Sequence, residues 1–211
     1  MFRLFSGDTR LNIEAIVEFR RRSFAAAGNL DPSTAGVDGY YDQLANCRQF
    51  GLACGDEMVG VIRHHLVLPS NRISPAYNVF GDILDPQLDQ GFCILDSSGF
   101  TVSRMDLHDR INVTTKLIAT SIYAAKHFRP SRLIATVREK HIGFYTRFLG
   151  GEVVCGPRYY PGRLAPLALV MQDTDSTLDR MRVSKMERYV MGDLERAVVD
   201  KAWSICHGND D

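Results

Sequence analysis

Arginine residues that stand where an apolar side chain is expected are the residues of this sequence best placed to do chemistry. The apolar spacing predicts a helix over about residues 11–27, with one face formed by Ile13, Ile16, Val17 and Phe24. Arg20 occupies that same face, and Arg63 lies within the apolar stretch 58–68. Such an arginine can lay its stem on the core and reach solvent, or it can point into a cleft. In a cleft, its guanidinium would bind a carboxylate through two hydrogen bonds.

Cysteines and histidines show no spacing that is typical of a metal site. The five cysteines are scattered without a C-x-x-C pair: Cys47, Cys54, Cys93, Cys155 and Cys206. An odd and scattered set predicts reduced thiols in a cytoplasmic protein rather than a disulfide framework. His64 and His65 are adjacent, so on a strand they would point to opposite faces and could not easily share an ion. We therefore expect no metal site, no tightly bound cofactor, and structural roles for the histidines.

The positive and negative charges of the chain balance, which argues against a nucleic-acid-binding protein. Its 211 residues carry 25 Lys and Arg against 25 Asp and Glu, so a general basic excess for nucleic-acid binding is missing. With 45% apolar residues the chain can build a core, and one domain over residues 1–211 is expected. No eighteen apolar residues run together and the N-terminal residues do not resemble a signal peptide. The sequence thus predicts a cytoplasmic protein without a membrane span.

The order of elements predicts a mixed α/β domain, in which a mostly antiparallel sheet carries helices on its faces. Strands are expected at residues 2–5, 50–54, 58–68, 92–95, 100–107, 133–137, 152–155 and 167–171. Further helices are expected at residues 112–128, 141–149 and, as a C-terminal helical extension with a break at 192–193, at residues 175–206. Residues 69–90 hold three of the eight prolines and predict a functional loop, either without regular structure or with short helices in it.

Two turn signals and one cap fix the boundaries of these elements. Gly55-Asp56 predicts a hairpin between strands 50–54 and 58–68, and residues 96–99 predict a second one between strands 92–95 and 100–107. Asn112 is the expected cap of the central helix.

With these elements in place, two groups of motifs resemble known enzymes. Residues 137–151, VREKHIGFYTRFLGG, are similar to the late helix-and-strand signature of the GNAT (GCN5-related N-acetyltransferase) superfamily. The first half resembles the branch that holds acyl-homoserine-lactone synthases and long-chain N-acyl amino acid synthases. The matching motifs are R-x-x-x-F at 20–24, the aromatic-Asp pair at 41–42, an arginine ending a strand at position 63, and Ser-Arg at 103–104.

Where this sequence differs from the lactone synthases, it favours the N-acyl amino acid synthases of the same branch. Lactone synthases carry a tryptophan where this chain has Leu30, and a glutamate that is a proposed base where it has Thr101. The tail 157–166 looks more like that of the N-acyl amino acid synthases. Residues 108–114 lack the glycines with which acetyl-CoA enzymes cradle a pyrophosphate, so a carrier-protein donor is favoured over free CoA.

The resemblance implies roles for particular residues. It implies a catalytic group of Asp42, Arg104 and Tyr145, and an acceptor-binding group of Arg20, Phe24, Arg63, Thr101 and Ser103. It places the donor near Met105, Asp106, Leu107, Asn112 and Thr114, with a backbone N–H of residues 105–107 binding the acyl carbonyl. Asp42 among three arginines would stay ionised, and the surplus positive charge could hold an acceptor's carboxylate. The alternatives are an ordinary buried ion-pair cluster, and a Tyr145 that merely packs on the sheet.

The resemblance implies an N-acyltransferase that moves a medium or long acyl chain from a phosphopantetheine thioester, on acyl carrier protein or CoA, to the amine of an amino acid. The alternatives are a homoserine-lactone synthase and a non-catalytic module that binds acyl thioesters. The basic triplet 20–22 could steer an acidic carrier protein, or it could be a solvated helix face. Residues 175–206 would pack on the sheet, mediate a homodimer, or cover a lipid tail.

Overall fold

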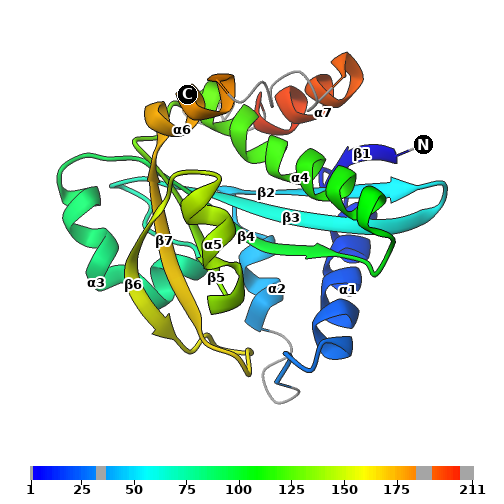
Figure 1. Cartoon of the computed structure of the whole chain (residues 1–211), viewed down its shortest axis with the longest axis horizontal. Coiled ribbons are helices and arrows are strands. Elements are labelled where there is room, and N and C mark those ends of the chain that lie inside the picture. Colours follow the sequence, from blue (N-terminus) through cyan, green and yellow to red (C-terminus); the bar gives the residue numbers. More distant parts are fainter. Residues whose placement is uncertain (1, 32–36, 184–191, 205–211) are drawn as a thin grey trace.

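The computed structural model describes residues 2–31, 37–183 and 192–204, which form a seven-stranded sheet (Figure 1). The strands are β1 (Phe2–Ser6), β2 (Cys47–Cys54), β3 (Glu57–Val67), β4 (Ile94–Val102), β5 (Arg132–Val137), β6 (Glu152–Arg158) and β7 (Leu167–Asp173). Their spatial order is β1-β2-β3-β4-β5-β7-β6, and every neighbouring pair is antiparallel except β4 and β5. The predicted mixed, mostly antiparallel sheet is confirmed.

Helices cover both faces of this sheet. One face carries α1 (Arg10–Ala26), α2 (Val37–Asp42) and α3 (Pro75–Asp89). The other carries α4 (Leu107–Phe128), α5 (Glu139–Arg147), α6 (Thr174–Val183) and α7 (Asp193–Ser204). Figure 1 shows α4, α6 and α7 on one side of β1–β3, and α1 and α2 on the other. We call these two sides the α1 face and the α4 face.

The first helix and the first hairpin agree with the sequence patterns. Thr9 caps α1 by accepting a hydrogen bond from the Asn12 N–H at 3.2 Å. Gly55 turns the β2–β3 hairpin with a φ of +61°, a conformation that costs glycine little. On β3, Gly60 lets α4 lie close to the sheet, because a Cβ there would stand 2.8 Å from the side chains of both Val113 and Leu117.

The second predicted hairpin is wrong, because β4 runs without a turn from Ile94 to Val102. The polar run 96–99 is accommodated inside the sheet: Asp96 is buried, and Ser97 lies 3.0 Å from the Nδ1 atom of His64. Gly99 has a φ of +63°, beside a shift in the β3–β4 register, so the glycine makes a bulge and not a turn. β4 ends at Val102, before the expected end at residue 107.

The central helix also begins earlier than predicted. Its cap is Asp106, whose Oδ1 accepts a hydrogen bond from the Asp109 N–H at 2.9 Å, and Asn112 lies inside the helix. The segment 69–90 contains α3, in agreement with the alternative that helices form within it. Ser74 caps α3 and Pro75 occupies its first turn, where a proline is favourable, although Phe80 kinks the helix.

The end of the described chain packs on the sheet. Trp203 of α7 is 1% exposed and makes an edge contact with Phe128 of α4, with ring centroids 4.8 Å apart. Met181 of α6 is buried against Ile122. The packing interpretation of the C-terminal extension is thus confirmed for α6 and α7, whereas residues 184–191 and 205–206 lie outside the described chain. None of the helices in the described ranges combines the length and apolar character that a membrane span needs.

Candidate active site

A split between the two parallel strands opens into a cavity. β4 and β5 pair from Ile94–Arg132 to Ser97–Ala135, and beyond that point the strands separate. A pocket of about 1330 Å³ lies at the split. All of residues 98–102 line it, so the free edge of β4 is open to the pocket. Backbone N–H groups on such an edge have no strand partner and are available to a ligand.

The pocket reaches both layers of helices, so it passes through the sheet. From the α1 face it is lined by Phe19 and Phe24 of α1, Tyr41, Arg63 and Tyr160. From the α4 face it is lined by Thr114, Ile118, Arg138, His141 and Tyr145. Arg163 stacks on Phe24 at one wall, with its guanidinium carbon 3.5 Å from the ring centroid. A long ligand can therefore enter from one face and meet a second ligand on the other.

A buried ion-pair cluster supports the α1 side of the pocket. The two Asp42 carboxylate oxygens accept hydrogen bonds from Arg20 and Arg63, the latter from Nη1 at 3.0 Å. Arg63 also donates from Nε to the Ser98 hydroxyl at 3.3 Å, which fixes it to the free edge of β4. The side chains of Arg20, Asp42 and Arg63 are at most 2% exposed. The predicted grouping of these three residues is confirmed, and Arg20 does not reach solvent.

Within this cluster only Arg63 lines the pocket, while Asp42 and Arg20 lie behind it. Arg20 passes beneath the bulge at Gly99, where its Cδ would stand 3.2 Å from an added Cβ. Gln49 donates its side-chain amide to the backbone carbonyl of Asp42 at 3.3 Å. The cluster thus holds α1, α2 and three strands together at the place where the pocket needs a fixed wall.

Arg104 does not belong to the ion-pair cluster, contrary to expectation. The chain leaves the sheet after Val102, so Arg104 lies on an exposed bend, and it makes no ion pair within the described ranges. It still lines the pocket, together with Ser103, whose N–H donates to the Val59 carbonyl at 2.9 Å. Its predicted catalytic role therefore stays a prediction, at the rim of the pocket and not beside Asp42.

Tyr145 combines the two interpretations that the sequence left open. Its ring packs on the α4 face of the sheet, against Ala135, Val137 and Val170, and it also lines the pocket. Burial raises the pKa of Tyr145 to about 12, so the phenol keeps its proton at neutral pH. A protonated phenol in this position can donate to an anion that forms in the pocket.

The expected donor-binding segment is placed differently from the prediction. Thr114 lines the pocket, but Met105, Asp106, Leu107 and Asn112 do not. Met105 packs on the core, and Leu107 opens α4 with 62% of its surface exposed. The early end of β4 is the reason, since a backbone donor at residues 105–107 required a strand that continued to Leu107. The free edge 98–102 takes that place.

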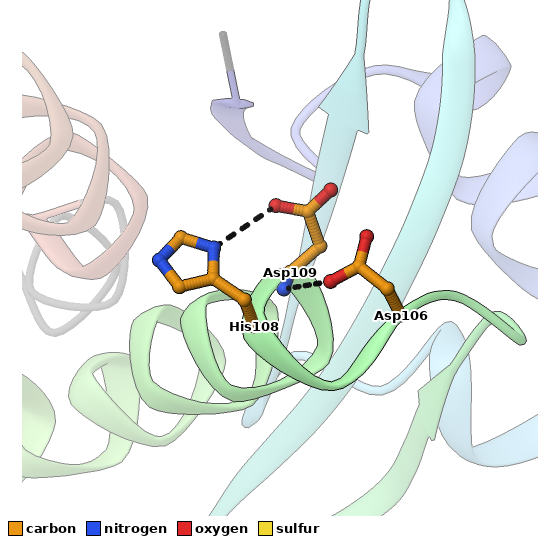
Figure 2. A group of neighbouring side chains, drawn as sticks. All are labelled: Asp106, His108 and Asp109. Atoms are coloured by element: carbon orange, nitrogen blue, oxygen red, sulfur yellow. Dashed lines mark hydrogen bonds and ion pairs between the residues drawn. The ribbon is translucent and has the colours of Figure 1, made fainter.

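Three neighbouring side chains at the start of α4 have their ligand atoms within 4.8 Å of one another: Asp106, His108 and Asp109 (Figure 2). Figure 2 shows that Asp106 turns back to the Asp109 backbone N–H, while the Asp109 carboxylate faces His108 Nδ1 at 3.6 Å. The Asp109 N–H also lowers the pKa of Asp106. Helix capping explains this exposed cluster, and we assign no metal to it.

Tyr41, Tyr160 and Asp96 lie at or beside the pocket and are among the residues that were not predicted as site residues. Tyr41 and Tyr160 line it, and Asp96 is fully buried on the same face of the sheet. Tyr41 was noted only as the neighbour of Asp42, and Tyr160 only as part of the tail 157–166. Asp96 was placed in a turn because an acidic residue inside a central strand is rare. Its signal is the apolar run 92–95 directly before it.

Similar solved structures show the fold of the chain. FeeM, an N-acyl amino acid synthase from uncultured soil microbes, aligns with a TM-score of 0.73 at 14% identity, over 88% of this chain and 97% of that one. The homoserine-lactone synthase LasI aligns at 0.57 and 15% identity, over 84% and 93%. Escherichia coli ElaA aligns with a TM-score of 0.54 at 14% identity, over 82% of this chain and 100% of that one. The chain therefore has the GNAT-like fold of acyltransferases.

The family is shown by a separate comparison. The model of the family described as N-acyl amino acid synthase FeeM matches residues 15–173, about three quarters of the chain. The protein belongs to this family and is an acyltransferase. Comparison with curated protein sequences finds no match.

Proposed function

We propose that this acyltransferase moves a medium or long acyl chain from a carrier-protein thioester to the amine of an amino acid. The observation that carries the proposal is the pocket through the split between β4 and β5, with Arg63 on one face and Tyr145 on the other. A thioester can reach the split from the α4 face and an amine from the α1 face. Membership in the family of N-acyl amino acid synthases supports this assignment.

The α1 side of the pocket has the chemistry to hold an amino acid. Arg63 supplies a fixed positive charge, and a guanidinium is suited to a carboxylate. Phe19, Phe24 and Phe100 add apolar surface to the lining. Thr101 stands in the lining where lactone synthases carry a glutamate, which favours an amino acid over the lactone synthesis described for LasI and BjaI.

The reaction needs donors for the oxyanion and a proton for the leaving sulfur. Attack of the amine on the thioester carbonyl places negative charge on its oxygen, and N–H groups along residues 98–102 can stabilise that charge. The C–S bond then breaks and the thiolate leaves on the α4 face. Tyr145 is protonated there, with its pKa raised to about 12, and can donate a hydrogen bond to the sulfur.

The start of α4 supports a carrier protein as the donor. A helix N-terminus attracts the pyrophosphate of CoA, but here Asp106 occupies it as a cap and Asp109 adds a second carboxylate (Figure 2). These charges would repel a pyrophosphate. The phosphopantetheine arm of a carrier protein has no pyrophosphate, so the same carboxylates oppose it less.

We also propose that the chain works as a single cytoplasmic domain. Four cysteines in the described ranges are free thiols, namely Cys47, Cys54, Cys93 and Cys155, which suits a reducing compartment. We further propose that two copies of the chain form a homodimer. Size-exclusion chromatography with light scattering would determine the oligomeric state.

A thiol-release assay tests the proposed function. The purified protein is mixed with acyl carrier protein loaded with acyl chains of different lengths, and with a panel of amino acids. We expect free sulfhydryl and the N-acyl product to appear only when an amino acid is present. Turnover with S-adenosylmethionine alone would indicate lactone synthesis, and no turnover with any donor, acyl-CoA included, would leave a binding module.

Arginines at the rim of the pocket allow a test of the carrier-protein donor. Arg104 and Arg110 are exposed and line the pocket near the start of α4. Because Arg104 is also a predicted catalytic residue, only Arg110 is replaced: Arg110→Ala should raise the KM for acyl carrier protein by about tenfold, since rim charges steer an acidic partner. The KM for acyl-pantetheine, which lacks the acidic protein, should stay unchanged. Arg10→Ala on α1 is the matched control, and an equal effect on both donors would contradict the proposal.

A further inference from the structure

Two buried polar groups at the α1 side of the split have no role in the proposed acyl transfer as described so far. Asp96 of β4 is 0% exposed, and Tyr160, which follows β6, lines the pocket. The Asp96 Oδ1 atom and the Tyr160 hydroxyl each lack a hydrogen-bond partner within the described ranges. A buried polar atom without a partner loses its hydrogen bonds to water and gains none in return, so two such atoms beside one pocket call for a functional explanation.

Asp96 is held in place by its other oxygen. Its Oδ2 accepts a hydrogen bond from the backbone N–H of Ala76, in the first turn of α3, at 3.0 Å. Tyr160 is fixed by its ring, which packs against Phe80 of the same helix with centroids 6.0 Å apart. The side chains are thus anchored to one helix, and the free oxygen atom of each belongs to a rigid group.

The charges around the two groups suit a proton acceptor. Burial raises the pKa of Asp96, while the Ala76 N–H, Ser74 and Arg63 lower it in part. Burial, and then the charge of Asp96, raise the pKa of Tyr160 well above its usual value. The Thr136 hydroxyl, which lies near the Tyr160 hydroxyl, lowers this pKa in part; Tyr41 raises it further, and Arg63 opposes this. A carboxylate whose pKa moves up towards neutrality becomes a stronger base at working pH.

The other carboxylates in or near the pocket, within the described residues, are less suited to accept a proton from the amine. Glu18 pairs with Arg21 on the exposed side of α1, and Asp56 and Glu57 lie at the exposed tip of the hairpin. Asp42 is bound by two arginines and lies behind the wall. Asp96 is therefore the carboxylate that is close to the split and still has an unoccupied oxygen.

We propose that Tyr160 and Asp96 accept the proton that the acceptor amine must lose before it attacks the thioester. This inference rests on the proposed function. The ammonium nitrogen donates a proton to the Tyr160 oxygen, while the Tyr160 hydroxyl proton passes through one intervening water molecule to Asp96 Oδ1, because the two atoms are not hydrogen-bonded to each other. The neutral amine then attacks the carbonyl carbon, the C–S bond breaks, and the remaining N–H proton goes to the thiolate. Asp96 later releases its proton to solvent, so one proton is liberated per amide formed.

Asp96 would take the role of base that is proposed for a glutamate in lactone synthases, which carry that glutamate at the position of Thr101. Thr101 cannot accept a proton at neutral pH, whereas Asp96 lies on the same strand, five positions earlier. Tyr160 bridges the remaining gap because it lines the pocket and Asp96 does not. Tyr160 would touch the substrate, and Asp96 would act through it.

The test is the pH profile of Tyr160→Phe, which removes only the hydroxyl. At pH 7 we expect kcat/KM for the amino acid to fall by about 100-fold, the usual range for a lost general base. Above the pKa of the acceptor the amine is already neutral, so at pH 9.5 the loss should shrink below about fivefold. Asp96→Asn should show the same recovery. Tyr159→Phe, an exposed neighbour, is the matched control and should equal the wild type.

Each outcome of this experiment decides the inference. A loss by Tyr160→Phe that is equal at all pH values, or no loss, would overturn it even if the wild type is active. If Asp96→Asn does not fold, the Tyr160→Phe profile alone decides. A wild type that releases no thiol with any pair of substrates would overturn the proposed function and, with it, this inference.

Discussion

Acidification from pH 7 to pH 4 is expected to remove most of the stability of the fold. Two buried histidines cannot take up a proton in the folded state over this pH range. His64 and His65 are both 0% exposed, and burial lowers the pKa of each from 6.5 to about 3. In the unfolded chain both titrate near the ordinary value. The unfolded state therefore binds more protons between pH 6.5 and 3, and stability present above pH 6.5 is lost as the pH falls.

The size of this effect follows from the pKa difference. Each histidine contributes a slope of up to about 1.4 kcal/mol per pH unit, so the pair contributes about 2.7 kcal/mol per unit. Between pH 6.5 and 4 the sum is about 7 kcal/mol, which is comparable with the whole stability of a typical domain. Urea unfolding at a series of pH values measures this slope directly.

Variants separate the histidines from other titrating groups. His64 is neutral and bound at both ring nitrogens, to Ser97 at 3.0 Å and Thr120 at 2.7 Å. His64→Gln should reduce stability at pH 7 but lower the slope by about half of the pair's contribution. His108→Gln changes an exposed ring and should leave the slope as it is. An unchanged slope in His64→Gln would contradict the prediction.

Periodicity and short-range signals were sufficient for the regular parts of the fold. The apolar spacing of α1, the Thr9 cap and the Gly55 turn are local properties, and each depends on residues close together in the chain. The motif resemblance also grouped Arg20 and Arg63 with Asp42 correctly. An arginine on an apolar face must find a carboxylate or solvent, so this pairing has a chemical reason that a sequence can reveal.

The remaining parts depend on contacts between distant segments. The polar run in β4 resembles a turn, but Asp96 is satisfied in part by the start of α3, and Ser97 by His64. That misplaced turn also moved the expected donor-binding residues off the pocket. Tyr160 lies close enough to feel the charge of Asp96 because the segment after β6 packs its ring on Phe80 of α3, the helix whose first turn binds Asp96. No local pattern predicts such a meeting.

Replacing Asp42 with alanine is the mutation expected to destabilise the chain most. Asp42 neutralises two arginines whose side chains are at most 2% exposed. Removing one partner of a buried ion pair leaves uncompensated charge and costs about 3–5 kcal/mol. The free energy of unfolding from urea titration at pH 7 is the measurement.

The control for Asp42→Ala is an ion pair of similar length at the surface. Glu14 accepts from Arg10 at 2.8 Å on the exposed side of α1, with side chains 57% and 91% exposed. Glu14→Ala should change the stability by no more than about 0.5 kcal/mol. A loss in Asp42→Ala that matches this control would show that the cluster has little structural weight.

Stability and activity can then be separated by replacing the whole cluster. A triple variant with Arg20→Met, Asp42→Leu and Arg63→Met exchanges the buried charges for apolar side chains of similar size, which is often neutral or stabilising. We expect its stability to recover to near that of the wild type. If Arg63 holds the acceptor's carboxylate, kcat/KM for the amino acid should nevertheless fall by about 10- to 100-fold, the weight of a charged hydrogen bond. Full activity in a stable triple variant would reduce the cluster to a structural ion pair, and the acceptor's carboxylate would have to be bound by another group in the pocket.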